Sequence, residues 1–172
     1  QLGSGAELYA AFGAAIPVVS DFRSLDVALG GQGAPLVPVA DALLFGNFEA
    51  CLNLGGFSNI SMDRAGRRVA WDVSPCNLVL NALARREGLP FDASGQLAAS
   101  GRVLPELLAD WMNLPYHKQV GPKSLGVEWL KGSFWPVLER HEHNGVLAAE
   151  DLLATAVAYI ASQVRLAVKG RQ

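Results

Sequence analysis

Apolar residues near the C-terminal end of the chain recur with the spacing of one long amphipathic helix. Glu150 and Asp151 open this segment and Lys169 closes it, a charge order that favours the helix dipole. Its apolar face consists of Leu153, Ala156, Val157, Ile160, Ala161, Val164 and Val168. Shorter apolar stripes predict further helices over 78–87 and 103–112.

The N-terminal quarter of the chain has a less regular pattern. Residues 5–12 carry the stripe of a short helix. Residues 16–20 have the composition of a buried strand, with Pro17 near the start, where a missing N–H donor costs least. Three glycines and two prolines predict an irregular loop over 21–38. A short helical turn is expected over 40–45.

The stretch from residue 48 to residue 72 reads as three short strands. The first two meet at Gly55 and Gly56, and a polar turn over 63–67 leads into a third strand that we expect to end at Asp72. A glycine corner can turn backbone N–H groups toward an anion, and a carboxylate at a strand end can act as a general base. The pattern therefore suggests a phosphate corner facing a base. The alternatives are an ordinary turn and, for Asp72, a helix N-cap.

The loop predicted over 21–38 contains a second polar cluster. Arg23 lies between Asp21 and Asp26 in the sequence. In one interpretation, either carboxylate neutralises the guanidinium within a packed loop. In the other, Arg23 lines a ligand site and presents its planar fork to a polar substrate.

Composition narrows the class of protein. The chain has 172 residues, of which 51% are hydrophobic and 17% charged, with a net charge of −2. These values indicate a packed core and provide no electrostatic footprint for nucleic acid or an anionic membrane surface. No apolar run suggests a membrane span, and without a signal peptide we interpret Cys51 and Cys76 as reduced thiols of a cytoplasmic protein. His117, His141 and His143 lack metal-ligand spacing, so we expect no protein-held metal.

Several strings closely resemble the anhydro-N-acetylmuramic acid kinases, in order along essentially the whole chain. They are Gln1-Leu2-Gly3, Asp21-Phe22-Arg23-x-x-Asp26 with Gly30-Gly31-Gln32-Gly33-Ala34-Pro35-Leu36-x-Pro38, the run from Leu52 to Ser61, Trp71-Asp72-x-x-Pro75-x-Asn77, and Pro122-Lys123-Ser124-x-Gly126-x-Glu128. The resemblance implies an α/β, ribonuclease-H-like (actin-like ATPase) fold of two lobes around a cleft. Residues 1–45 would then end the first lobe and line the sugar, while 46–172 would begin the second, with strands over 48–72 and a helical region over 76–169.

The resemblance also implies an activity. The family uses ATP and Mg²⁺ to convert 1,6-anhydro-N-acetylmuramate and water to N-acetylmuramate 6-phosphate during peptidoglycan recycling, and its members are homodimers. By resemblance, Asp72 is the base that activates water. The expected phosphate-binding residues are Gly55, Gly56 and Asn59, and the expected sugar-binding residues are Gln1, Arg23, Asp26 and Asn77.

Two departures from the family pattern keep alternatives open. Ser74 and Cys76 stand where the family commonly has glycine, and the family's N-terminal phosphate loop and later adenosine segment are missing. Because the chain starts at Gln1 without methionine and stops just after its longest predicted helix, we expect an inactive central piece of a longer enzyme. The alternatives are a catalytically silent sugar-binding remnant and a related kinase for another sugar.

Overall fold

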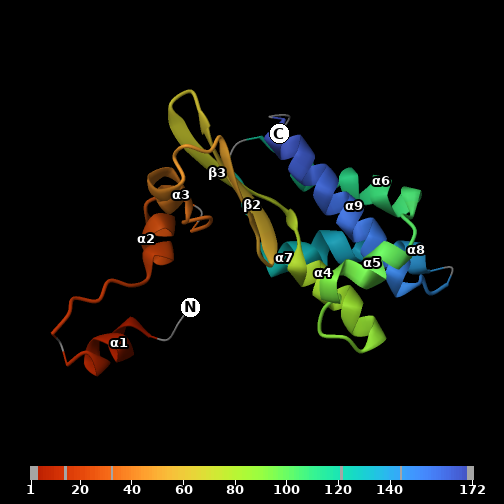
Figure 1. Cartoon of the computed structure of the whole chain (residues 1–172), viewed down its shortest axis with the longest axis horizontal. Coiled ribbons are helices and arrows are strands. Elements are labelled where there is room, and N and C mark those ends of the chain that lie inside the picture. The colour runs from red at the N-terminus through yellow and green to blue at the C-terminus, as the bar shows by residue number, and fades with distance from the viewer. Residues whose placement is uncertain (1–3, 14, 32, 121, 144, 170–172) are drawn as a thin grey trace. The chain divides into compact units, whose positions relative to one another are not determined.

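The computed structural model describes residues 4–13, 15–31, 33–120, 122–143 and 145–169. The chain divides into two compact units, Gln1–Leu36 and Val37–Gln172, and Figure 1 shows the order of their elements. The mixed α/β class expected from the sequence is confirmed. The division into parts of two lobes stays a prediction.

The first unit contains two short helices, α1 (Gly5–Ala11) and α2 (Phe22–Ala28). Helix α1 is the one expected over 5–12, and Ser4 and Glu7 form a capping box at its start. Helix α2 corrects the prediction of an irregular loop over 21–38, because its seven residues precede all of the glycines and prolines that suggested the loop.

The strand expected over 16–20 is wrong. These residues have irregular backbone, and the side chains of Ile16 and Val19 are 52% and 73% exposed. A strand needs a neighbour for its backbone N–H and C=O groups, and the first unit has no strand in its described part. A composition rich in β-branched residues was therefore not sufficient to form a strand here.

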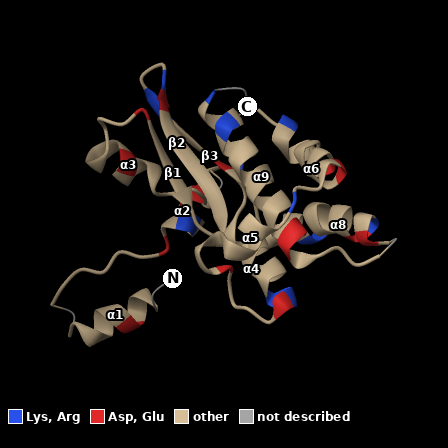
Figure 2. Ribbon diagram, turned by 45° about the vertical axis from the view of Figure 1, so that its right-hand side comes forward, with Lys and Arg blue, Asp and Glu red and all other residues tan. Residues whose placement is uncertain are grey.

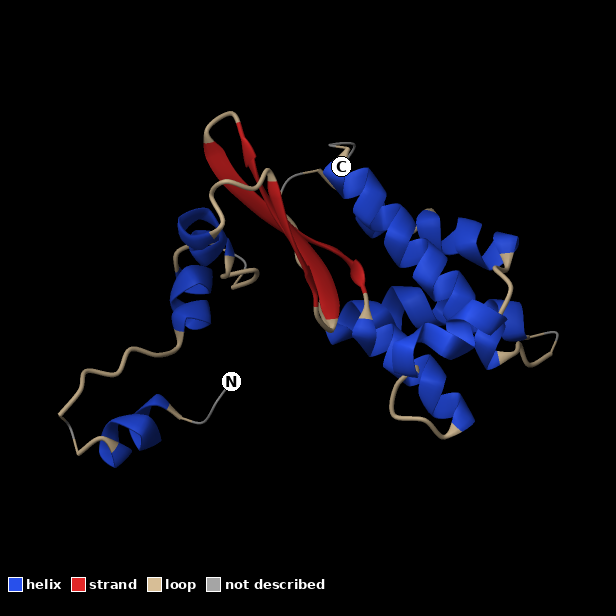
Figure 3. Cartoon of the chain, in the orientation of Figure 1, coloured by secondary structure: helices blue, strands red, loops and turns tan. Residues whose placement is uncertain are grey.

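The second unit is built on one antiparallel sheet in the order β1-β2-β3. Its strands are β1 (Ala50–Leu54), β2 (Phe57–Arg64) and β3 (Arg67–Pro75), drawn red in Figure 3. Ala65 and Gly66 both have positive φ in the β2–β3 turn, the geometry that favours a tight hairpin. The expected strands are thus confirmed, but β3 continues past Asp72 to Pro75, because Ser74 still pairs with Ser58.

Helices surround the sheet and complete the second unit (Figures 1 and 3). They are α3 (Pro38–Leu44), α4 (Asn77–Ala84), the 3₁₀ helices η1 (Arg85–Glu87), η2 (Ala93–Gly95) and η3 (Pro115–Lys118), α5 (Gln96–Ser100), α6 (Pro105–Met112), α7 (Val127–Trp129), the π-helical turn η4 (Leu130–Phe134), α8 (Trp135–Glu142) and α9 (Ala149–Val168). Helices α4, α6 and α9 confirm the helices expected from the apolar stripes, although Val157 and Val168 of the apolar face expected for α9 are 44% and 57% exposed. The sequence pattern missed α5 and α8.

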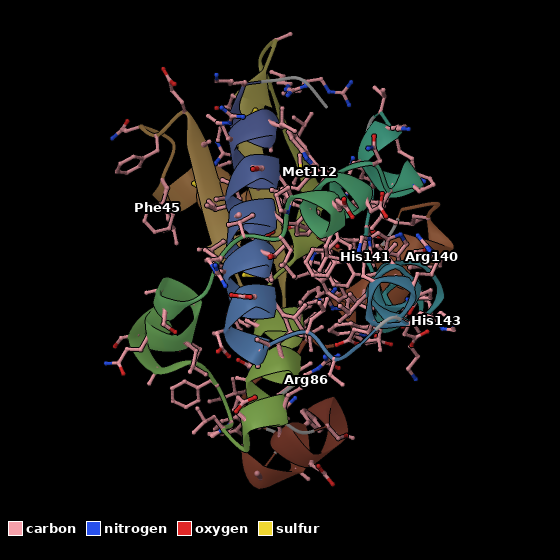
Figure 4. The ribbon with its side chains drawn as sticks, turned by 90° about the vertical axis from the view of Figure 1, so that its right-hand side faces the viewer. Phe45, Arg86, Met112, Arg140, His141 and His143 are labelled. Carbon is pink, nitrogen blue, oxygen red and sulfur yellow. The ribbon has the colours of Figure 1, made fainter. Side chains whose placement is uncertain are left out.

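Helix α9 is the centre of the main hydrophobic core. The fully buried Tyr159 on α9 packs against Trp111 of α6 and Phe134 of η4, whose rings stack with centroids 4.4 Å apart. Figure 4 shows Met112 of α6 beside α9, where the Met112 Sδ accepts a hydrogen bond of 3.2 Å from Gln163 Nε2. By length and composition α9 could cross a membrane, but half of its apolar window is buried inside the protein. Its role as the core helix therefore accounts for its apolar character.

The two faces of the sheet differ in character. Ile60, Met62 and Trp71 are buried on one face, where they form a smaller core with Ala167 of α9. Their neighbours along the strands lie on the other face, which is polar. Charged residues of the hairpin gather at its tip, around the β2–β3 turn (Figure 2).

Candidate functional site

Asp72 lies within β3 and is 5% exposed. Its backbone N–H donates to the Lys123 carbonyl at 2.9 Å, and its carbonyl accepts a 2.6 Å hydrogen bond from the Tyr116 hydroxyl. The carboxylate Oδ2 accepts the backbone N–H of Leu125 at 2.8 Å. Three atoms of Asp72 are therefore held by one segment of the chain, residues 116–125.

The alternative interpretation of Asp72 as a helix cap is wrong. The N-cap of the following helix, α4, is Cys76. Because β3 continues to Pro75, Asp72 lies inside the strand and before the helix start, and its Oδ2 bonds to Leu125 instead.

Asn59 is the direct cross-strand partner of Asp72, and Asn53 is the partner of Asn59 on β1. Residues in register on neighbouring strands share a face, so these three polar side chains form a row on the polar face of the sheet. A β-bulge between Ser58 and Asn59 sets this register, with Val73 as the extra residue between the pairs of β3. The structure therefore brings together two of the residues singled out in the sequence, Asn59 and Asp72.

The glycine corner packs against the start of α4. The Gly55 carbonyl accepts the Asn77 N–H at 3.1 Å, and the Gly56 carbonyl accepts the N–H groups of Cys76 and Leu78 at 2.9 and 3.2 Å. In a trans peptide the N–H points opposite to the C=O. The N–H groups of Gly56 and of the residue after it therefore point away from the helix, the orientation that an anion site at this corner requires.

The absence of a side chain at Gly56 also permits the glycine corner to lie close to Leu78. A Cβ added there would lie 3.1 Å from Leu78 Cγ. The side chain of Asn77 donates to the Leu54 carbonyl at 3.0 Å and is exposed at the mouth of the same corner. Asn77 thus joins the β1 end to the α4 start.

The side chains of Ser74 and Cys76, the two departures from the family pattern, are buried. Ser74 is fully buried, and its hydroxyl lies 2.9 Å from that of Ser58. Cys76 is 4% exposed and packs in the main core with Val79 and Leu83, and burial raises the pKa of its thiol. Both side chains are therefore accommodated inside the protein rather than at the glycine corner's surface.

Lys123 has a structural position that its sequence context did not reveal. Its Nζ donates to the carbonyls of Tyr116 and Gln119, both at 3.1 Å, and lies 4.6 Å from the centre of the Tyr116 ring. These contacts replace hydration of the ammonium group in a residue that is 5% exposed. Burial lowers the pKa of Lys123. The ammonium group of Lys123 therefore points into its own loop.

The ionisation states of the neighbouring aromatic residues follow from burial. Burial and the charge of Asp72 raise the pKa of Tyr116, so its hydroxyl stays a donor. Burial and the charge of Lys123 lower the pKa of His117 to about 4. The neutral His117 shares a 2.7 Å hydrogen bond between Nε2 and the Tyr159 hydroxyl. Sequence reasoning did not identify Tyr116 or Leu125, although the matching string over 122–128 pointed to this segment.

The expected sugar residues of the first unit form their own small network. Arg23 Nη1 donates to the Gly33 carbonyl, and Asp26 Oδ2 accepts the Gly33 N–H at 2.7 Å. Asp21 accepts a 2.8 Å hydrogen bond from the Ser24 hydroxyl. Arg23 and Asp26 therefore hold the two peptide groups on either side of Gly33, an arrangement that neither interpretation of this cluster anticipated. Gln1 lies outside the described residues.

No group of three or more His, Cys, Asp or Glu side chains that could hold a metal ion lies within the described part of the chain. His141 pairs with Asp110 through Nε2 and Oδ2 at 2.9 Å, on the helix α8 that Figure 4 shows end-on beside the label of His141. Cys51 and Cys76 are free thiols.

The sequence profile of the anhydro-N-acetylmuramic acid kinases matches residues 1–172. The chain belongs to this family. It is 43% identical over 170 residues to the anhydro-N-acetylmuramic acid kinase of Pseudomonas putida, an alignment that covers 95% of this chain and 46% of the relative.

Other relatives of the same name show similar likeness. The kinase of Paramagnetospirillum magneticum is 40% identical over 173 residues, which cover 97% of this chain and 46% of that protein. The kinase of Methylobacterium nodulans is 41% identical over 175 residues, which cover 98% of this chain and 44% of the relative. The chain therefore spans somewhat less than half the length of these relatives.

Proposed function

We propose that this chain supplies the general base and one phosphate-binding corner of an ATP-dependent kinase acting on 1,6-anhydro-N-acetylmuramate. The observation that carries the proposal is the fixed position of Asp72, held at three atoms and in register with Asn59 on a polar sheet face. A general base must be oriented in this way before it can accept a proton efficiently.

In the proposed reaction, Asp72 takes a proton from the water that attacks the anomeric carbon. The 1,6-anhydro bond opens, and its O6 atom receives the phosphoryl group. Asp72 is 5% exposed, so the residue is largely shielded from bulk solvent. The Leu125 N–H bond to Oδ2 holds the carboxylate in one orientation.

ATP would supply the phosphoryl group, with Mg²⁺ neutralising charge on the phosphates. The N–H groups directed away from α4 at the Gly55-Gly56 corner fit a phosphate oxygen, and Asn59 and Asn77 provide amide groups nearby in the fold. Nucleotide-bound Mg²⁺ commonly keeps several waters and few protein ligands.

The wider family expectations belong to the same proposal. They are a ribonuclease-H-like architecture, a sugar site including Gln1, Arg23, Asp26 and Asn77, a homodimer, and a cytoplasmic role in peptidoglycan recycling without nucleic acid or membrane partners. The antiparallel three-stranded sheet followed by helices supports the architecture. Sedimentation of the product of the complete reading frame tests the dimer.

Substitution of Asp72 tests the base directly. Asp72→Asn keeps the volume and an oxygen that can accept the Leu125 N–H, so we expect little loss of stability and a fall in turnover of about 100-fold or more. The assay is ADP release with the anhydro sugar and ATP, using the product of the complete reading frame. Asp92→Asn is the matched control, because Asp92 also accepts backbone N–H groups, at the start of α5.

The outcomes separate the proposal from its alternatives. Near-normal turnover by Asp72→Asn would contradict the role of Asp72. Tight sugar binding by calorimetry without ADP release in the unmodified protein would favour a silent sugar-binding remnant. Phosphorylation of another hexose, with no action on the anhydro sugar, would favour a related kinase.

A further inference from the structure

The segment over residues 116–125 holds Asp72 along the outer edge of β3. The N–H and C=O of one strand residue point to the same edge, and here they meet the Lys123 carbonyl and the Tyr116 hydroxyl. These two bonds fix the backbone, and the third, from the Leu125 N–H to Oδ2, fixes the rotation of the side chain. The carboxylate is therefore oriented by a segment 44 to 53 residues away in sequence.

The segment itself is closed by Lys123. Its Nζ joins the carbonyls of Tyr116 and Gln119, so the two ends of the turn before Leu125 are held by one side chain. The Tyr116 ring lies under the same ammonium group at 4.6 Å. Lys123 thus ties the residue that carries the Tyr116 hydroxyl to the part of the segment just before Leu125.

We propose that Tyr116 and Lys123 are positioning residues for Asp72: they hold the 116–125 segment against the edge of β3, and that segment orients the carboxylate for proton transfer. The proposal rests on the proposed function of Asp72 as the base. It extends that function by naming two side chains that raise kcat through the orientation of Asp72 and that need not touch substrate.

A purely structural role would give a different kinetic result. Buried polar groups stabilise a fold wherever they are satisfied, so their loss lowers the melting temperature whether or not catalysis depends on them. A misoriented base instead lowers kcat and leaves sugar and ATP binding unchanged. The split between kcat and KM therefore distinguishes the two roles.

The main variant is Tyr116→Phe, which removes the hydroxyl that bonds to the Asp72 carbonyl and keeps the ring under Lys123. The matched control is Thr155→Val, which removes another buried hydroxyl, bonded to the Asp151 carbonyl and the Leu104 N–H outside the 116–125 segment. Both proteins are made from the complete reading frame and assayed with 1,6-anhydro-N-acetylmuramate and ATP. We expect both to melt earlier, with kcat about tenfold lower only for Tyr116→Phe and KM for both substrates within about twofold.

A second variant covers failure of the first to fold. Lys123→Met removes the ammonium tether while keeping the backbone carbonyl that accepts the Asp72 N–H. It too should lower kcat selectively. Unchanged kcat in a folded Tyr116→Phe or Lys123→Met, or an equal fall in Thr155→Val, would overturn the positioning role.

Asp72→Asn is measured beside these variants. If Asp72→Asn retains turnover, the proposed function of Asp72 fails and the positioning role fails with it. If Asp72→Asn is inactive while Tyr116→Phe keeps full kcat, the base assignment stands and the positioning role alone is wrong.

Discussion

Acid should weaken the fold of this protein through the buried imidazole of His117. The folded-state pKa of His117 is lowered from 6.5 to about 4, first by burial and second by the charge of Lys123. An unfolded chain takes up a proton on this imidazole near its ordinary pKa, whereas the folded chain does so only near pH 4. The stabilising effect is therefore complete above about pH 6.5 and is lost as the pH falls toward about 4.

The size of the effect follows from the two pKa values. A difference of one between folded and unfolded pKa corresponds to about 1.4 kcal/mol. Full protonation would thus cost about 3 kcal/mol, of which about 2 kcal/mol is lost between about pH 8 and about pH 5. Such a loss is a substantial part of the free energy of unfolding of a typical domain.

Urea unfolding at a series of pH values measures this loss. Carboxylates also titrate at the acidic end, so the wild-type protein is compared with His117→Gln, whose amide can still meet the Tyr159 hydroxyl. His143→Gln is the matched control, since His143 is exposed at the end of α8. We expect the pH dependence to flatten by about 2 kcal/mol in His117→Gln and to stay unchanged in His143→Gln. The same pH dependence in wild type and His117→Gln would refute the reasoning.

Two substitutions outside the site test the packing of the helices, each by thermal or urea unfolding. Gly101→Ala should lower the free energy of unfolding by about 3 kcal/mol or more, because the added Cβ would lie 2.0 Å from the Glu150 carbonyl oxygen. The control is Gly132→Ala, which should be nearly neutral because its Cβ meets nothing within 4 Å. Equal effects of the two substitutions would contradict this explanation. Asp92→Ala should cost about 1 kcal/mol, because the Asp92 carboxylate accepts two N–H groups at the start of α5, at 2.9 and 3.0 Å; an unchanged unfolding midpoint would count against that cap.

The elements that the sequence pattern predicted correctly are those whose partners are close in the chain. Helix α9 follows from a stripe of apolar residues at helical spacing, and the β2–β3 hairpin follows from a polar turn between two apolar runs. The strand expected over 16–20 failed, because a strand depends on a neighbour that the local sequence does not specify.

The candidate site divides in the same way. The corner at Gly55 and Gly56 and the carboxylate at Asp72 were recognisable from composition, turn chemistry and resemblance to a family. The bulge that places Asn59 opposite Asp72 could not be recognised from the sequence. One extra residue in a strand changes every later pairing, but it changes the hydrophobic pattern too little to indicate where the bulge lies.

By itself, then, the sequence determined the family, the mixed α/β class, the hairpin and the long core helix, since each is encoded in local spacing or in matching strings. The tertiary structure alone decided the surroundings of Asp72. Tyr116 and Leu125 reach Asp72 from 44 and 53 residues away, and Lys123 turns its ammonium group into its own loop. Hydrogen bonds between such distant residues depend on how helices and strands pack, and that packing leaves no periodic trace in the chain.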